Sequence, residues 1–183
     1  WRAHGSYTCE KLTNQWIEKI VSPDSIVYDI GANVGAYSLL LGKKIQVTNS
    51  SGCVYSFEPE SMNFYSLNKN ILINKLNDYV IAFPLALSNK LDFKSFLLSS
   101  PIEGSATHSI DHENADIDFT PVFKQGVVTI SLDQLIASES IPFPNHIKID
   151  VDGLESLILN HMPNTLANKD LHSVIVEIDE KNK

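Results

Sequence analysis

Carboxylate side chains follow several apolar runs of this chain, in the positions where β-strands are expected to end. These side chains are Asp29, Glu58, Asp150 and Glu177. In open α/β sheets, ligands bind at the carboxyl ends of the strands, so these residues are expected at one edge. Carboxylates gathered there repel each other unless cationic or hydrogen-bonding groups lie among them. The pattern therefore indicates a ligand site at this edge.

A glycine-rich turn after the first expected strand fits two cofactor patterns. The dinucleotide pattern G-x-G-x-x-G/A, aligned from Gly31, places Asn33 and Ala36 at its second and third positions, so the middle glycine is missing. The acidic-x-G-x-G-x-G pattern of a nucleotide–methionine cofactor gives Asp29, Gly31, Asn33 and Gly35. Asparagine tolerates positive φ better than most residues, so Asn33 is a plausible substitute for glycine.

Glu58 ends the second expected strand, where a carboxylate can accept both ribose hydroxyls of an adenosine. This position fits either cofactor. The alternative to a cofactor site is that Glu58 is an ordinary solvated glutamate and that the glycine-rich turn is an ordinary strand–helix connection. Both explanations would have to be true at once.

Three segments of the chain resemble the FkbM family of S-adenosylmethionine-dependent methyltransferases. They are the Asp-Ile-Gly-Ala-Asn-Val-Gly turn within residues 28–38, Phe-Glu-Pro at 57–59, and Ile-Lys-Ile-Asp-Val-Asp-Gly-Leu-Glu at 147–155. They come in that family's order, and the resemblance runs from about residue 26 to 178. The last segment is the most specific, and Asn33 is typical of this family.

The resemblance implies a class I, Rossmann-like methyltransferase fold, S-adenosylmethionine as methyl donor, and a hydroxyl of a small molecule such as a sugar or natural product as acceptor. It places the turn around the methionine portion, Glu58 at the ribose and the segment from Ala86 to Ser88 near adenine. The expected cofactor-binding residues are Asp29, Gly31, Ala32, Asn33, Gly35, Glu58, Pro59, Ala86, Ser88 and Asp150.

Methyl transfer from a sulfonium depends largely on the alignment of acceptor, methyl and sulfur. A general base helps when the acceptor is a hydroxyl. The candidates for this base are Asp150, Glu177 and His108, the last in a polar segment over 99–125 that is expected to be a variable loop.

Asp150, Asp152 and Glu155 could together hold Mg²⁺ or Ca²⁺. Glu155 is more simply explained as a residue of the first helical turn, where a carboxylate favours the helix dipole. We therefore predict no metal.

Strands alternating with helices predict an α/β, doubly wound and mostly parallel sheet. A single domain is expected over 1–183, with an N-terminal helical segment at 1–25 and a cofactor-binding core at 26–178. The expected strands are 26–30, 52–57, 80–84, 91–98, 126–130, 146–150 and 171–178, and the expected helices are 10–21, 36–41, 61–74, a helix capped by Ser131, and 154–159. The methyltransferase fold closes with a C-terminal β-hairpin, and here either this hairpin is missing or another element covers the sheet edge.

The chain of 183 residues has 14 basic and 22 acidic side chains, a formal net charge of −8. Such a surface repels phosphate backbones, so nucleic acid is not an expected partner. No apolar run approaches the length that is needed to span a membrane. Two cysteines make no disulfide framework, which predicts reduced thiols in a cytoplasmic protein.

Two other functions remain open. One is an NAD-dependent oxidoreductase of Rossmann type, against which the missing middle glycine counts. The other is a non-catalytic scaffold domain that keeps the cofactor fold. The expected partner of the methyltransferase is a small hydroxyl-bearing acceptor, whose identity the sequence does not reveal, and it is equally silent on oligomeric state.

Overall fold

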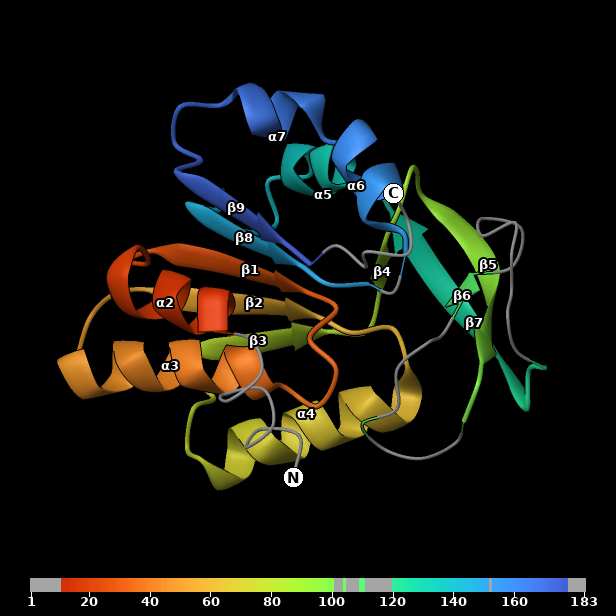
Figure 1. Ribbon diagram of the computed structural model, residues 1–183, viewed down its shortest axis with the longest axis horizontal. Helices are drawn as coiled ribbons and strands as arrows, with labels where there is room; N and C mark the ends of the chain where they lie inside the picture. Colours follow the sequence, from red (N-terminus) through yellow and green to blue (C-terminus); the bar gives the residue numbers. More distant parts are fainter. Residues whose placement is uncertain (1–10, 101–103, 105–108, 111–119, 152, 178–183) are drawn as a thin grey trace.

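Five parallel strands form the central sheet, in the order β3-β2-β1-β8-β9 (Figure 1). The computed structural model describes residues 11–100, 104, 109–110, 120–151 and 153–177. The strands are β1 (Ile26–Ile30), β2 (Cys53–Phe57), β3 (Val80–Phe83), β8 (His146–Ile149) and β9 (Ser173–Val176). Within this part of the chain the predicted doubly wound, mostly parallel α/β fold is confirmed.

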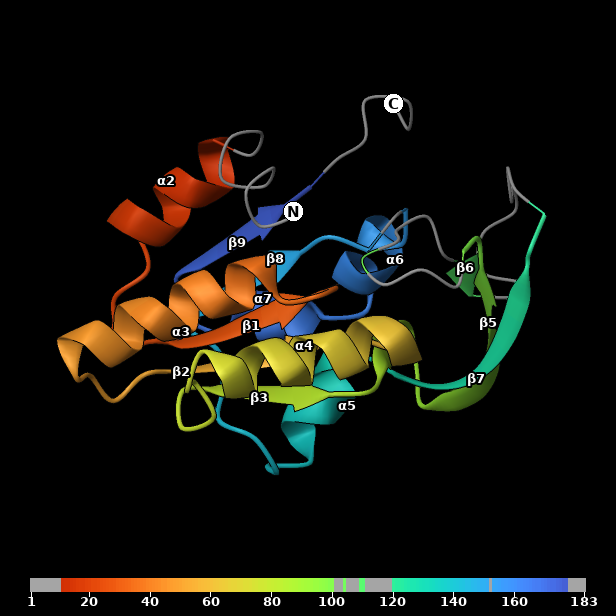
Figure 2. The same cartoon turned by 90° about the horizontal axis from the view of Figure 1, so that it is seen from below.

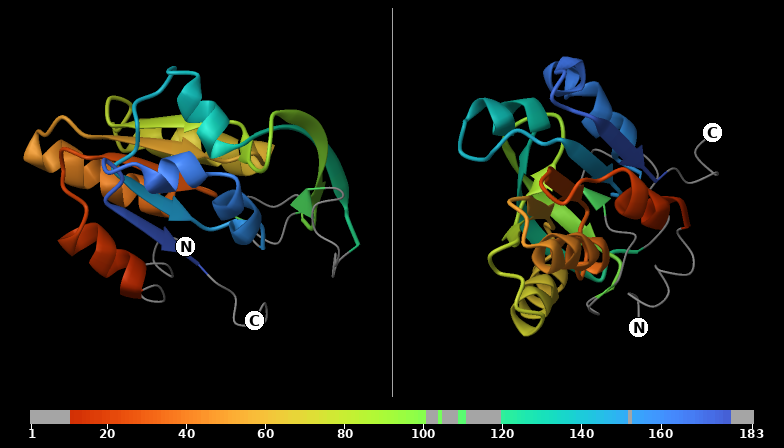
Figure 3. Two further views of the ribbon diagram at one scale, coloured as in Figure 1. Left: turned by 90° about the horizontal axis from the view of Figure 1, so that it is seen from above. Right: turned by 90° about the vertical axis from the view of Figure 1, so that its left-hand side faces the viewer.

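Helices cover both faces of this sheet (Figure 3). One face carries α2 (Lys11–Lys19), α3 (Ala36–Thr48) and α4 (Ser61–Ile73), and the other carries α5 (Leu132–Ala137), α6 (Glu155–Asn160) and α7 (Pro163–Ala167). Successive strand residues point to opposite faces. Val27 therefore packs in the cluster with α3 and α4, while Tyr28 packs with α5 and α6.

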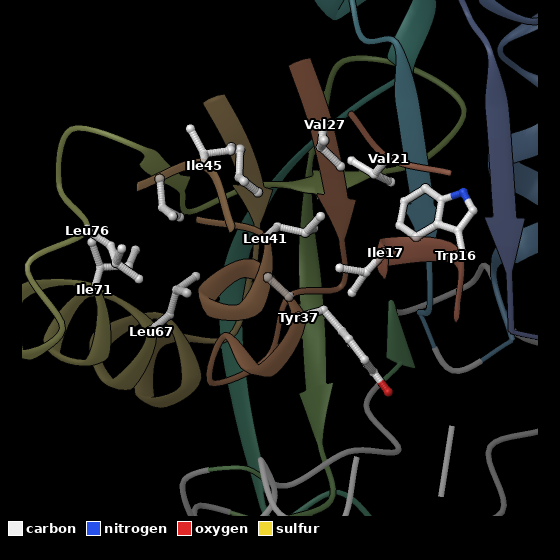
Figure 4. Packing of buried hydrophobic residues seen from close by; sticks show 13 residues of the cluster. Trp16, Ile17, Val21, Val27, Tyr37, Leu41, Ile45, Leu67, Ile71 and Leu76 are labelled. Atoms are coloured by element: carbon white, nitrogen blue, oxygen red, sulfur yellow. The ribbon is translucent and has the colours of Figure 1, made fainter. Parts of the chain in front are cut away.

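The cluster beneath α2, α3 and α4 is made of aliphatic side chains with two aromatic residues at its margin (Figure 4). Leu41 of α3 and Leu67 of α4 are at most 1% exposed. Burial of each such side chain contributes about 1.5–3 kcal/mol to folding. None of the helices in the described ranges combines the length and hydrophobicity that a bilayer crossing requires.

A second sheet lies beyond the carboxyl ends of the parallel strands, which the sequence did not predict (Figures 1 and 2). Its order is β4-β7-β5-β6, with β5 and β7 antiparallel. Its strands are β4 (Ala86–Leu87), β5 (Asp92–Leu98), β6 (Ser109–Ile110) and β7 (Phe123–Ile130). The expectation of a loop over 99–125 is therefore wrong at β6 and at the start of β7. Cross-strand pairing with β5 extends β7 through polar residues that carry no clear alternation of their own.

Other element boundaries differ more modestly. The expected helix beginning at Ala36 continues to Thr48, and α7 was not predicted. The helix passes through Gly42, where an added Cβ would lie 2.4 Å from a methyl of Val80, so the glycine lets α3 approach β3 closely. The predicted cap of α5 is present, since Ser131 accepts the Gln134 N–H in a reciprocal capping box.

Helix α2 is fixed to the amino ends of β8 and β9 through Trp16. Its indole N–H donates to Ser173 Oγ at 2.8 Å, and the same hydroxyl lies 2.8 Å from His146 Nδ1. The Trp16 and His146 rings meet edge-on with centroids 6.0 Å apart. Trp16 therefore docks α2 on the sheet.

Lys44 of α3 holds the C-terminal end of α2. Its ammonium donates to the carbonyl oxygens of Ile17 and Val21, each at 2.6 Å, and of Glu18 at 3.3 Å. Carbonyl groups at a helix C-terminus lack partners within the helix, so a lysine there satisfies them. Burial lowers the pKa of Lys44, and the nearby Glu18 carboxylate opposes that shift.

The cluster around His146 generates a prediction about stability and pH. Burial, with smaller contributions from His172 and Lys44, lowers the pKa of His146 from 6.5 to about 4. Between these values the unfolded chain binds a proton that the folded chain does not, so this group makes stability fall as the pH drops from 6.5 towards 4. We expect His146→Gln to flatten this loss, measured by urea unfolding at about pH 7 and about pH 5.

The matched control is His161→Gln, because His161 is an exposed residue whose ring contacts a carbonyl of its own helix. It should keep the pH dependence of the parent chain. The same loss of stability on acidification in parent and His146→Gln would contradict the assignment.

Candidate functional site

The turn between β1 and α3 depends on three residues with left-handed backbone conformation. These are Gly31 (φ 79°), Asn33 (φ 51°) and Gly35 (φ 93°), so asparagine does take a glycine-like conformation, as predicted. An added Cβ on Gly31 would lie 1.8 Å from the carbonyl oxygen of Asp150, which excludes any other residue at this position. The turn is thereby packed against the end of β8.

The neighbouring strand β2 holds the same turn. The carbonyl oxygen of Phe57 accepts the N–H groups of Gly31 and Ala32, both at 3.0 Å. The next residue, Glu58, accepts the Asn33 N–H on Oε2 at 2.7 Å and the Glu60 N–H on Oε1 at 2.8 Å. These two bonds hold the Glu58 carboxylate at the end of β2, against the turn.

A pocket opens at this edge, between the ends of the parallel strands and the second sheet. Its polar groups come from Gly31, Asn33, Glu58, Asn63 and Asp150. Its apolar walls come from both sheets and from the segments that follow β3 and β8, and include Ile30, Phe57, Leu85, Leu87, Phe96, Ile110, Val151 and Leu154. Apolar walls with a few convergent polar groups are typical of small-molecule and cofactor sites.

A buried ion cluster lies beside the pocket. Lys148 is 3% exposed, and its ammonium lies 2.8 Å from Asp150 Oδ2 and 3.7 Å from Asp29 Oδ1. Asp29 is 1% exposed, and its Oδ2 accepts the Ser38 hydroxyl at 2.5 Å. The two carboxylates and one ammonium leave one net negative charge at the start of the turn.

The structure brings most of the predicted cofactor residues together. Gly31, Asn33, Glu58, Pro59, Ala86 and Asp150 line the pocket. Ala32, Gly35 and Asp29 belong to the turn or support it from beneath without lining the pocket. Ser88 is fully buried, and its N–H donates to the carbonyl oxygen of Ile130, so it is not placed at the pocket.

The three candidate bases have different positions. Asp150 lines the pocket, with 29% of its side chain exposed. Glu177 follows β9 as an exposed residue and is not among the residues that line the pocket. His108 lies outside the described residues.

The structure describes two of the three carboxylates that were considered as metal ligands, Asp150 and Glu155. The third, Asp152, lies outside the described residues. Glu155 is in the first turn of α6, as predicted, and its Oε1 accepts the N–H groups of Val151 and Gly153 at 3.2 Å. This places its carboxylate on the chain that follows β8, where it shapes the turn after Asp150.

Sequence reasoning missed two residues at this site, Lys148 and Asn63. A lysine between Ile147 and Ile149 in a central strand was a readable signal, since buried lysines need a partner. Asn63 is 1% exposed, lines the pocket and accepts the Gly104 N–H on Oδ1 at 2.7 Å. Nothing in the sequence marked Asn63, because its role depends on which segment lies opposite it.

The architecture is that of class I methyltransferases, as comparison with solved structures shows. The precorrin-6Y C5,15-methyltransferase of Geobacter metallireducens aligns with a TM-score of 0.53 at 12% identity, over 96% of this chain and 66% of that one. The methyltransferase FkbM of Methylobacillus flagellatus aligns with a TM-score of 0.51 at 17% identity, over 80% of this chain and 31% of that one. At these identities the likeness establishes the fold alone.

The family follows from the sequence itself. Residues 29–182 match the model of the methyltransferase FkbM domain, and the chain belongs to this family. The hexuronic acid methyltransferase AglP of Haloferax volcanii is 31% identical over 155 residues, which cover 85% of this chain and 56% of AglP. The chain thus spans little more than half the length of this curated relative.

Membership in this family implies S-adenosylmethionine as the cofactor, and the pocket residues fit it. Glu58 lines the pocket at the end of β2, where a carboxylate can accept ribose hydroxyls. Leu85, Leu87 and Phe96 provide an apolar wall for an adenine ring, and the net negative charge of the ion cluster suits a sulfonium cation.

Two buried glutamates allow a matched test of this assignment. Glu58 and Glu60 are 5% and 3% exposed, and each carboxylate accepts two backbone N–H groups, but of the two only Glu58 lines the pocket. We expect Glu58→Gln to weaken S-adenosylhomocysteine binding by about tenfold or more, because a charge-assisted hydrogen bond contributes about 1.5–3 kcal/mol.

Glu60→Gln, which leaves one amide oxygen in place of the two carboxylate oxygens that cap α4, should lower the unfolding midpoint but keep the affinity within about threefold. Titration calorimetry of both folded variants measures the difference. Equal loss of affinity in the two variants would mean that Glu58 acts through the fold alone.

Proposed function

We propose that this chain is a catalytic S-adenosylmethionine-dependent O-methyltransferase that acts on a hydroxyl of a sugar or related small molecule. The observation that carries the proposal is the convergence of Gly31, Asn33, Glu58 and Asp150 on one pocket whose far wall belongs to the second sheet. The proposal treats residues 1–183 as one domain, with its core at 26–178, an N-terminal segment at 1–25 and a variable segment at 99–125.

The charges at the pocket favour a hydroxyl as the acceptor. The described lining residues include two carboxylates, Glu58 and Asp150, and neither lysine nor arginine. A negatively charged acceptor group would be repelled there, whereas a hydroxyl can donate a hydrogen bond to a carboxylate. Its position in the pocket lining supports Asp150 as the general base.

Bound S-adenosylmethionine would supply an electrophilic methyl group, so that the acceptor oxygen forms a C–O bond while the C–S bond breaks and its electron pair stays on sulfur. Asp150 would orient the acceptor hydroxyl and take its proton. Glu58 and the glycine turn would fix the donor, and the apolar side chains Phe96 and Ile110 would limit water at the pocket wall.

A sugar is the preferred acceptor class because of one relative. AglP is named a hexuronic acid methyltransferase and is 31% identical to this chain. We therefore propose a hexuronic acid, or a glycan unit of that type, as the first acceptor to test.

The test uses methyl-labelled S-adenosylmethionine with the methyl glycosides of glucuronic acid and of glucose. We expect label on the uronic acid glycoside in a form that survives mild base, since an ether is formed at a hydroxyl. Label that mild base releases would identify a carboxylate as the acceptor and contradict the hydroxyl assignment. Absence of label in both sugars, with the cofactor bound, would contradict the sugar class.

A further inference from the structure

The buried lysine beside the pocket has more than a packing role. Its ammonium has three neighbours in different directions: Asp150 Oδ2 at 2.8 Å, Asp29 Oδ1 at 3.7 Å and the Tyr37 ring, whose centroid is 4.9 Å away. Lys148 and Asp29 are direct partners in the register of β8 and β1. The lysine is therefore fixed by two strands and by α3.

Each neighbour depends on this cation. Asp29 Oδ1 is fully buried and has no hydrogen-bond partner within the described part of the chain, so the charge of Lys148 is what compensates it there. Asp150 is different, because 29% of its side chain is exposed and it lines the pocket. Lys148 thus connects a carboxylate beneath the glycine turn to a carboxylate at the pocket wall.

We propose that Lys148 is a positioning residue of the methyl-transfer site, which holds Asp150 in place as an anion facing the sulfonium of the cofactor. The inference rests on the proposed function, because it needs S-adenosylmethionine in this pocket. An acceptor hydroxyl held by Asp150 must also meet the methyl group, so the sulfonium has to lie near this carboxylate.

The consequence is a difference between two ligands. S-adenosylmethionine carries the sulfonium charge and S-adenosylhomocysteine does not, so an anionic Asp150 favours the first over the second. Without Lys148, the two carboxylates lose their shared cation, and carboxylates in that situation take up protons more readily. A protonated Asp150 no longer attracts the sulfonium.

Other charged or titratable groups surround this cluster and bear on its pH dependence. Within the described residues they include Tyr37 on α3, Glu58 after β2, Glu155 on α6 and Glu177, which follows β9 beside the end of β8. Since the proposed variants leave all four unchanged, a difference between parent and variant reports on the cluster itself.

The experiment measures the affinities of the chain for both ligands by calorimetry, at about pH 7.5 and about pH 5.5. For Lys148→Met we expect the ratio of S-adenosylmethionine to S-adenosylhomocysteine affinity to fall by about fivefold or more on acidification, as a carboxylate becomes protonated. The parent chain should keep its ratio, and Lys148→Arg should restore that behaviour. A purely structural role of Lys148 would lower both affinities together.

Lys44→Met is the matched control. Lys44 is a second lysine held by several protein oxygens, but these are carbonyl oxygens at the C-terminal end of α2, away from the pocket. It should leave the ratio unchanged. A folded Lys148→Met chain with the parent's ratio at both pH values would overturn the inference.

If Lys148→Met does not fold, as circular dichroism would show, Asp150→Asn decides. This variant should reduce the preference for the charged ligand at both pH values alike, and an unchanged preference would overturn the inference. Failure of the folded parent chain to bind either ligand would instead overturn the proposed function, and the inference with it.

Discussion

The candidate site depends on the attachment of the glycine turn to the end of strand β2. The Phe57 carbonyl and the Glu58 carboxylate together accept three N–H groups of this turn, from Gly31, Ala32 and Asn33. The turn can follow this path because its residues accept left-handed φ and because Gly31 has no side chain. One short segment of β2 thus fixes both the shape of the turn and the carboxylate proposed to bind ribose.

Charge compensation is the second constraint on this edge of the sheet. Parallel strands bring Asp29 and Asp150 to one end, and the Lys148 ammonium lies within ion-pair distance of both carboxylates. A buried ion pair is weak evidence for stability, since desolvation opposes the attraction between its charges. Its position beside the pocket suggests that its contribution lies in the electrostatics of the ligand site.

The sequence predicted the parallel strands, the turn and the pocket positions of Gly31, Glu58 and Asp150, because each of these is marked by a short local pattern. Short apolar runs located β1, β2 and β8. Asn33 was expected to substitute for glycine in the turn. Strands were expected at 91–98 and 126–130, but their pairing in a second sheet was missed, because β7 pairs with β5 across a long and polar segment. The resemblance placed Ser88 near adenine together with Ala86, whereas Ser88 is buried and its N–H donates to the Ile130 carbonyl of the second sheet.

Calorimetric titration of the folded chain with S-adenosylmethionine, S-adenosylhomocysteine and NAD tests the central claim most directly. The account predicts dissociation constants on the order of micromolar for both sulfur nucleotides and much weaker binding of NAD. A folded chain that binds neither sulfur nucleotide, or that binds NAD more tightly than both, would contradict it.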